Sequence, residues 1–287
     1  MKQTYSKLIQ GCMTWGIWGK NFSIDAMSRQ ISETLELGIT TFDHADIYGM
    51  YTTEAAFGKA FQKAGINRNE IQLISKCGIQ LVNEDRTSYV KHYDYSKDYI
   101  IAQAEQSLKN LKTDYLDLFL LHRPSPLMEV DEVKEAITTL KTQGKIRDFG
   151  VSNFTPQQIE HLKADLEITT NQIQCSLTHV TPFEDDSLFY HQQHHIKTMA
   201  WSPLGGYYNL GEEHPLTKSI LRMSEQYSCT ASQVVLAWLL QHPSQIYPVL
   251  GTTSTTRIKD ALKSLDIVLS LQDWFVLFEA SRGKEVD

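Results

Sequence analysis

The stretch GITTFDHADIYG, from Gly38 to Gly49, indicates the fold because it joins a buried strand to a group of polar side chains. A glycine that ends a helix comes first, and an apolar run typical of a strand follows it. Two acids, a histidine and a tyrosine then come before Gly49. In an α/β barrel, polar residues just past the carboxyl end of a strand lie at the face that carries active sites. The stretch therefore predicts either a polar loop over a barrel or half of an active site.

Short apolar runs of the same kind recur along the chain and alternate with segments that have helical periodicity. They are nearly continuous in valine, isoleucine, leucine and phenylalanine, which is typical of parallel strands covered on both faces. The predicted strands are Leu8–Met13, Thr40–Phe42, Ile71–Lys76, Tyr115–His122, Ile146–Val151, Asn171–Cys175, Thr198–Leu204 and Ile246–Leu250. Eight strands, each followed by a helix, predict a (β/α)₈ TIM barrel. We expect one domain over residues 1–287, with an appended C-terminal helix at Gln272–Ser281.

Composition narrows the class of protein. A chain of 287 residues with 41% hydrophobic residues can bury a sizeable core. The net charge of −7 argues against nucleic-acid binding. The four cysteines are far apart in the sequence, so we expect reduced thiols. The chain has no signal-peptide pattern and no apolar run of about 18 residues, so we expect a cytoplasmic protein without a membrane span.

Four polar residues at three successive strand ends suggest proton chemistry. Asp43 and Tyr48 follow the second predicted strand, Lys76 ends the third and His122 ends the fourth. A lysine beside a tyrosine lowers the phenol pKa, and a carboxylate holds the lysine in place. A histidine can orient a carbonyl oxygen, and the set suits proton delivery to an oxygen that becomes an alkoxide. Taken singly, each residue also has a purely structural interpretation, but jointly the four favour function.

Six motifs carry a resemblance to a known family. GITTFDHADIYG, LISKCG, YLDLFLLHRP, GKIRDFGVSNF, NQIQCS and AWSPLGG resemble the aldo-keto reductase superfamily in order and spacing, most of all its bacterial YdhF-type oxidoreductases. The resemblance implies a catalytic tetrad of Asp43, Tyr48, Lys76 and His122. Tyr48 would be the general acid, Lys76 and Asp43 would depress its pKa, and His122 would position the substrate carbonyl.

The same resemblance implies an NADPH site and a substrate pocket. Ser152, Asn153 and Gln172 would bind the nicotinamide amide, and Trp201 would stack on its ring, with Thr14 nearby. Residues near the phosphates would be Ser202, Leu204 and Gly205 for the pyrophosphate, and Thr252, Thr253 and Arg257 for the 2′-phosphate. Many relatives carry lysine or arginine where this chain has Gly251 and Thr252, so the ratio of NADPH to NADH preference stays open. Trp15 would line the substrate pocket, and insertions at Ile79–Lys97 and Gly206–His214 would set substrate choice.

The expected function is reduction of small aldehydes or ketones with NADPH by a monomer or weak oligomer. An alternative is a regulatory subunit of the same fold that binds NADPH and senses redox state. A third is a metal-dependent barrel hydrolase. We expect no metal site, because His191 and His195 have a ligand spacing without a partner acid, and we expect them on a solvated helix face. The physiological substrate and the product stereochemistry stay open.

Overall fold

A computed structural model describes residues 5–84 and 86–287 of the chain. The chain divides into two compact units. The first unit runs to Asn171 and includes Gly251–Thr253, and the second unit consists of Gln172–Leu250 and Ser254–Asp287. The prediction of one domain over the whole chain stays a prediction.

Eight parallel strands form a closed barrel in the order β1-β10-β9-β8-β7-β6-β3-β2, which confirms the predicted fold class. Each lies at a predicted position, with ends that differ by a few residues. The strands are β1 (Ile9–Gly11), β2 (Thr41–Asp43), β3 (Gln72–Cys77), β6 (Leu116–Leu121), β7 (Ile146–Ser152), β8 (Thr170–Gln174), β9 (Lys197–Trp201) and β10 (Tyr247–Leu250). In the first unit, Gly11 pairs with Asp43, and Lys76 pairs with Leu120.

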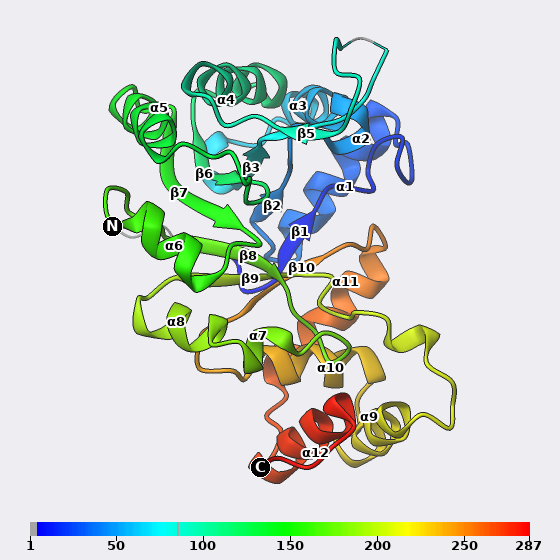
Figure 1. Ribbon diagram of the computed structural model, residues 1–287. Helices are drawn as coiled ribbons and strands as arrows, with labels where there is room; N and C mark the ends of the chain where they lie inside the picture. The colour runs from blue at the N-terminus through cyan, green and yellow to red at the C-terminus, as the bar shows by residue number, and fades with distance from the viewer. Residues whose placement is uncertain (1–4, 85) are drawn as a thin grey trace. The chain divides into compact units, whose positions relative to one another are not determined.

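Helices of the first unit cover the outer side of its strands, as Figure 1 shows for α3, α4 and α5. The helices of the first unit are α1 (Ile24–Glu36), α3 (Thr53–Ala64), α4 (Lys97–Leu111), α5 (Val130–Thr142) and α6 (Pro156–Lys163), and the short α2 (Tyr48–Tyr51) follows β2. The local signals in the sequence have their expected effect. Gly38 follows α1 with φ 83°, and Thr155 caps α6 by accepting from the Gln158 amide, with Pro156 in the first turn.

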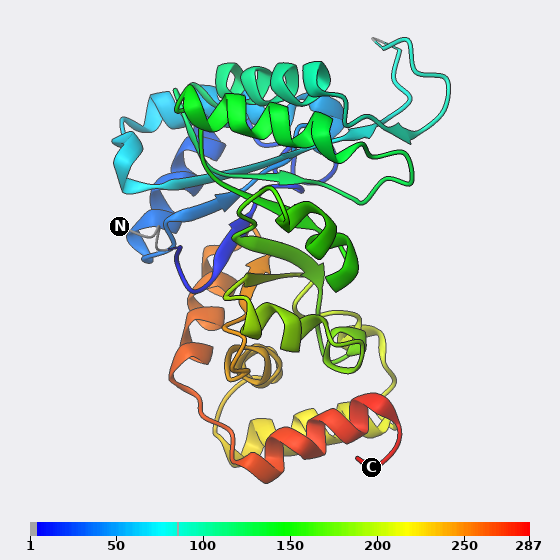
Figure 2. The ribbon, with the colours of Figure 1, turned by 60° about the vertical axis from the view of Figure 1, so that its left-hand side comes forward.

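The second unit ends in the predicted C-terminal helix, α12 (Leu271–Arg282), which packs along α9 (Figure 2). Its remaining helices are α7 (Thr181–Glu184), α8 (Ser187–Gln193), α9 (Pro215–Gln226), α10 (Ala231–Leu240) and α11 (Thr255–Leu262). Trp274 of α12 stacks on Trp238 of α10 with ring centroids 4.9 Å apart. Each indole donates to the main-chain carbonyl of the other tryptophan, at 3.1 and 3.0 Å. These contacts join α12 to the core of its unit.

Two elements differ from the expectations. Within the predicted insertion after β3, the strands β4 (Ile79–Gln80) and β5 (His92–Tyr93) form a separate antiparallel sheet, too short to leave a periodic signal. The expectation of a solvated helix face was wrong for His191, which is fully buried with Nδ1 2.9 Å from the Thr198 hydroxyl. His195 is exposed as expected, but it lies beyond the end of α8. In the described part of the chain, no helix is both long and apolar enough to cross a membrane.

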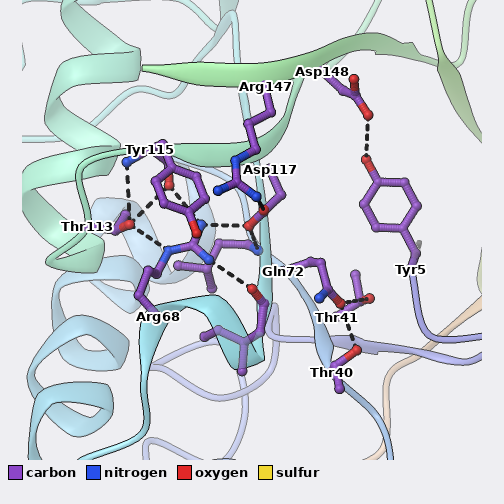
Figure 3. Close-up of polar contacts among 12 residues, drawn as sticks. Tyr5, Thr40, Thr41, Arg68, Gln72, Thr113, Tyr115, Asp117, Arg147 and Asp148 are labelled. Carbon is purple, nitrogen blue, oxygen red and sulfur yellow. Dashed lines mark hydrogen bonds and ion pairs between the residues drawn. The ribbon is translucent and has the colours of Figure 1, made fainter. Parts of the chain in front are cut away.

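Asp117 of β6 organises the amino ends of three strands in the first unit (Figure 3). Its carboxylate accepts from Arg68 Nη2 at 2.6 Å, from the Leu73 amide at 2.7 Å and from Arg147 Nη1 at 3.3 Å. Both guanidinium groups also lie over the Tyr115 ring, 3.9 and 3.8 Å from its centroid. Polar residues at this end of a barrel contribute to stability, since the chemistry lies at the carboxyl ends.

Asp117→Asn is expected to lower the free energy of unfolding by about 2 kcal/mol, because the amide loses the charge that strengthens its hydrogen bonds. Urea denaturation followed by circular dichroism measures the change. Asp148→Asn is the matched control, since Asp148 lies nearby in β7 and accepts one long bond from the Tyr5 hydroxyl at 3.4 Å. Equal effects in the two variants would contradict the role given to Asp117.

Candidate active site

The first unit brings together the four residues that the sequence predicted as a tetrad. Asp43 ends β2, Tyr48 begins α2, Lys76 lies near the end of β3 and His122 directly follows β6. The three strands are neighbours in the barrel, so their carboxyl ends meet at one edge. All four side chains are buried. The arrangement forms a compact group of titratable residues at the face of the barrel where active sites lie.

The Lys76 ammonium is the centre of this group. Nζ donates to both carboxylate oxygens of Asp43 at 2.8 Å and to the His44 main-chain carbonyl at 2.7 Å. It also lies 3.2 Å from the Tyr48 hydroxyl. The lysine side chain is fully buried, so these contacts replace water around the charge. The ammonium is therefore held at one point, directly beside the phenol.

Burial changes the ionisation of both partners. Burial lowers the pKa of Lys76, but the charge of Asp43 and the contact with Tyr48 raise it, and the net pKa lies above its usual value. Burial raises the pKa of Tyr48, the Lys76 charge lowers it and the Asp43 charge raises it, which gives a pKa of about 12. Lys76 lowers the pKa of Tyr48 as expected, but the expectation was wrong for Asp43, and burial outweighs the effect of Lys76. The phenol is protonated at neutral pH, which is the form that a proton donor needs.

His122 is also kept neutral. Burial, followed by the charges of Lys76 and Arg123, lowers its pKa well below the usual value. Its ring meets the Tyr48 ring edge to face, with centroids 6.2 Å apart. A neutral imidazole has one N–H donor and one acceptor nitrogen. His122 can therefore donate a hydrogen bond to a carbonyl oxygen without carrying a charge.

The two tryptophans of the loop after β1 have different surroundings. Trp15, predicted in the substrate pocket, is fully buried. Three aromatic rings pack around it: Phe22, Phe42 and Phe57. Trp18 is 39% exposed, and its ring centroid lies 6.2 Å from that of Tyr48. In this structure Trp15 is thus a core residue, and Trp18 is the indole beside the phenol. The sequence offered no signal to separate them beyond the glycines on either side of Trp18.

Further predicted cofactor residues of the first unit lie at loop starts. Ser152 ends β7, and Asn153 follows with φ 64° and donates from Nδ2 to the Ser152 hydroxyl at 2.8 Å. The Thr14 hydroxyl donates to the Gly251 carbonyl at 3.3 Å, so the loops after β1 and β10 lie side by side. The Thr252 carbonyl accepts from Gln10 Nε2 at 3.0 Å. Thr253, which follows, is half-buried.

The second unit holds the remaining predicted cofactor residues. Trp201 ends β9 and is half-buried, Ser202 follows with φ 50°, and Leu204 is half-buried. Gly205 has φ 56°, and a Cβ there would collide with the Thr178 hydroxyl, which accepts from the Gly206 amide at 2.8 Å. Only glycine fits this tight turn.

Two more predicted residues lie elsewhere in the second unit. Gln172 is buried in β8. Arg257 is exposed in the first turn of α11, where its amide donates to the hydroxyl of the capping residue Ser254 at 3.4 Å. A helix start with an exposed arginine suits a phosphate group.

Two buried polar residues next to the tetrad belong to the polar stretch after β2, but no role in the reaction was predicted for them from the sequence. The Asp46 amide donates to the Lys76 carbonyl at 3.0 Å, and its Oδ1 accepts from the Ile47 amide at 2.7 Å. Burial and the charge of Glu54 raise the Asp46 pKa well above its usual value. His44 is fully buried against Phe57, and burial lowers its pKa to about 3. Both residues support the backbone that carries the tetrad.

Comparison with known proteins shows the family of the chain. A model of the Aldo/keto reductase family matches residues 7–280. Oxidoreductase YdhF of Escherichia coli (strain K12) is 40% identical over 287 residues, which cover 98% of this chain and 95% of that protein. A 6-dehydroglucose reductase of Agrobacterium fabrum is 37% identical, with coverage of 98% and 97%.

A solved structure also resembles the chain along most of its length. The crystal structure of an aldo/keto reductase from Klebsiella pneumoniae, in complex with NADP and acetate, matches with a TM-score of 0.78 and 27% identity. The match covers 95% of this chain and 90% of that one.

Proposed function

The chain belongs to the aldo/keto reductase family, and from that premise we propose that it reduces aldehydes or ketones to alcohols with NADPH, with Tyr48 as the proton donor. One observation carries the proposal. A buried ammonium, Lys76 Nζ, contacts a carboxylate and a phenol at once, at 2.8 and 3.2 Å. In this arrangement the phenol is suited to donate a proton to an alkoxide, and the ammonium is suited to stabilise the phenolate that remains.

Each tetrad residue has a role in this reaction. NADPH, when bound, supplies the hydride to the carbonyl carbon. The Tyr48 hydroxyl gives its proton to the carbonyl oxygen, and the Lys76 charge stabilises the resulting phenolate. Asp43 holds Lys76 charged and in place. The neutral His122 donates a hydrogen bond that orients the carbonyl oxygen.

Each unit, taken by itself, holds residues of types suited to parts of NADPH. The glycine at position 205 lets backbone come close to phosphate oxygens, since its left-handed turn excludes a side chain. In the proposal, Ser202 and Leu204 join it at the pyrophosphate, and Trp201 stacks on the nicotinamide. The amide of the nicotinamide would be bound by Ser152, Asn153 and Gln172, with Thr14 nearby. Thr252, Thr253 and Arg257 would hold the 2′-phosphate.

Titration of the purified protein with NADPH, and separately with NADH, tests the cofactor. Quenching of tryptophan fluorescence reports binding, and we expect saturation at lower concentrations of NADPH. The complex is then assayed with small aldehydes and ketones. These include 6-dehydroglucose, because one relative is named a 6-dehydroglucose reductase. Consumption of NADPH supports the reductase. Binding of NADPH without turnover of any carbonyl would favour a regulatory subunit, and no binding of either nucleotide would overturn the proposal.

Trp18→Ala is expected to raise the KM for an aromatic aldehyde about tenfold, because the substrate loses an exposed ring beside Tyr48. The Kd for NADPH should stay unchanged. Steady-state kinetics with benzaldehyde and with a short aliphatic aldehyde measure the effect, which should be larger for the aromatic substrate. Ile17→Ala is the matched control, since Ile17 is the exposed neighbour in the same loop. Equal KM values in wild type and Trp18→Ala would remove Trp18 from the pocket.

A further inference from the structure

Three successive residues after Tyr48 have left-handed backbone conformations. The φ angles are 58° at Gly49, 53° at Met50 and 70° at Tyr51. Residues with side chains rarely adopt this region, and seldom in succession. Strained backbone of this kind persists only where the surroundings fix it, and it concentrates at functional sites. The left-handed turn Gly49–Tyr51 therefore requires contacts that hold it.

Hydrogen bonds within the loop stabilise part of the left-handed turn. The Thr52 hydroxyl donates to the Gly49 carbonyl at 2.6 Å, and the Thr52 amide donates to the Tyr48 carbonyl at 3.2 Å. A Cβ on Gly49 would collide with the Thr53 hydroxyl, so only glycine fits there. The carbonyl of Tyr48 is thus fixed from the far side of the turn.

The side chain of Tyr51 fastens the turn to the sheet formed by β4 and β5. Its hydroxyl accepts from the Leu81 amide at 2.9 Å and donates to the Ile79 carbonyl at 3.4 Å. The Arg86 guanidinium carbon lies 3.6 Å from the centroid of the Tyr51 ring, and Arg86 Nη1 donates to Gln80 Oε1 at 2.9 Å. Tyr51 is therefore held at its ring and at its hydroxyl by one segment, which we call the β4–β5 arm (residues 79–84 and 86–93) (Figure 1).

The arm also packs on the tetrad itself. Ile79 of the arm belongs to one buried cluster with Ala45, Ile47 and Tyr48, and Tyr51 and Leu81 pack against that cluster. Tyr48 is thus held from two sides, by its own ring contacts and by the turn that follows it in the chain.

We propose that Tyr51 is a positioning residue, which links the β4–β5 arm to Tyr48 through the left-handed turn and holds the Tyr48 hydroxyl beside Lys76 Nζ. The inference rests on the proposed function, in which that hydroxyl is the proton donor. It gives the arm a role in the proton-transfer geometry in addition to any contact with substrate.

Kinetics of Tyr51→Phe and Tyr51→Ala test the inference. Tyr51→Phe removes only the two hydroxyl contacts, and Tyr51→Ala removes the ring as well. We expect kcat to fall about threefold and about tenfold, because small displacements of a reacting group have large effects on rate. The KM for the aldehyde and the Kd for NADPH should stay within twofold of wild type. Tyr89→Phe is the matched control, since Tyr89 is a fully solvated tyrosine of the same arm.

A double-mutant cycle separates positioning from general damage to the fold. If Tyr51 acts through the Tyr48 hydroxyl, adding Tyr51→Ala to Tyr48→Phe should cause no further loss of kcat. A full additional tenfold loss in the double variant would overturn the inference, as would an unchanged kcat in both single variants.

A second measurement does not depend on activity. In protein labelled with ¹³C at Cζ of tyrosine, the NMR signal missing from Tyr48→Phe is that of Tyr48. It should shift in both Tyr51 variants and stay in place in Tyr89→Phe, and an unmoved signal would overturn the inference. A wild-type protein that turns over no carbonyl would overturn the proposed function instead, and the NMR result would still decide whether Tyr51 positions Tyr48.

Discussion

Tyr48→Phe is expected to lower kcat for carbonyl reduction about 10²-fold or more while the Kd for NADPH stays near the wild-type value. The substitution removes the hydroxyl that lies 3.2 Å from Lys76 Nζ and leaves the ring in contact with Trp18 and His122. Packing should therefore be kept, and only the acidic proton is lost.

Steady-state assays with a fixed aldehyde, together with fluorescence titration of NADPH, measure the two quantities separately. Tyr89→Phe serves again as the control, because it removes a tyrosine hydroxyl that is exposed on the arm. A Tyr48→Phe enzyme with near wild-type kcat would mean that another group delivers the proton. A parallel loss of NADPH binding would mean that Tyr48 acts through the cofactor site.

The pH dependence has a defined sign. Because the pKa of Tyr48 is raised to about 12, the phenol keeps its proton throughout the neutral and mildly alkaline range. In the direction of carbonyl reduction, the donor form is therefore present at acidic and neutral pH alike and is lost only as the pH rises toward that pKa.

Lys76→Met is expected to abolish activity and also to lower the free energy of unfolding by about 3–5 kcal/mol. Both carboxylate oxygens of Asp43 accept from Lys76 Nζ at 2.8 Å, and both side chains are almost completely buried. Removing the ammonium leaves a buried carboxylate without the charge that balances it. Breaking such a pair costs far more than breaking a pair at the surface.

The double variant Asp43→Leu/Lys76→Met separates stability from chemistry. Replacing both members of a buried ion pair with apolar side chains is often neutral for stability, so most of the lost free energy should return while activity stays absent. Lys97→Met is the surface control, since Lys97 pairs with Glu135 at 2.7 Å in an exposed position, and its effect should be below about 1 kcal/mol. Denaturant unfolding measures the free energy of unfolding of the wild type and of the three variants. A double variant as unstable as Lys76→Met would contradict this account.

The barrel and the order of the tetrad residues were predictable from the sequence, because the signals are local. Apolar runs mark the eight strands, and glycine, proline and threonine mark helix ends at Gly38 and Thr155. Once parallel strands close into a barrel, residues at their carboxyl ends meet at one edge. That geometric rule predicts that Asp43, Tyr48 and Lys76 lie close together.

The ionisation and accessibility of the same residues depended on the tertiary structure. The sequence suggested a depressed Tyr48 pKa from a neighbouring charge, but burial outweighs that charge and raises the pKa to about 12. It also suggested Trp15 for the pocket, whereas aromatic packing buries Trp15 and leaves Trp18 exposed. Both outcomes depend on how many atoms surround a group, and residue spacing along the chain does not contain that information.

The left-handed turn after Tyr48 is the clearest case of the second kind. By itself, the sequence determined that a polar segment follows a buried strand and that Gly49 ends it. Only the tertiary structure decided that Met50 and Tyr51 continue in a disfavoured conformation, because Tyr51 is held by a segment about 30 residues away in the chain. Local preferences oppose that backbone and distant hydrogen bonds impose it. Local pattern could therefore determine the barrel but not the backbone that follows Tyr48.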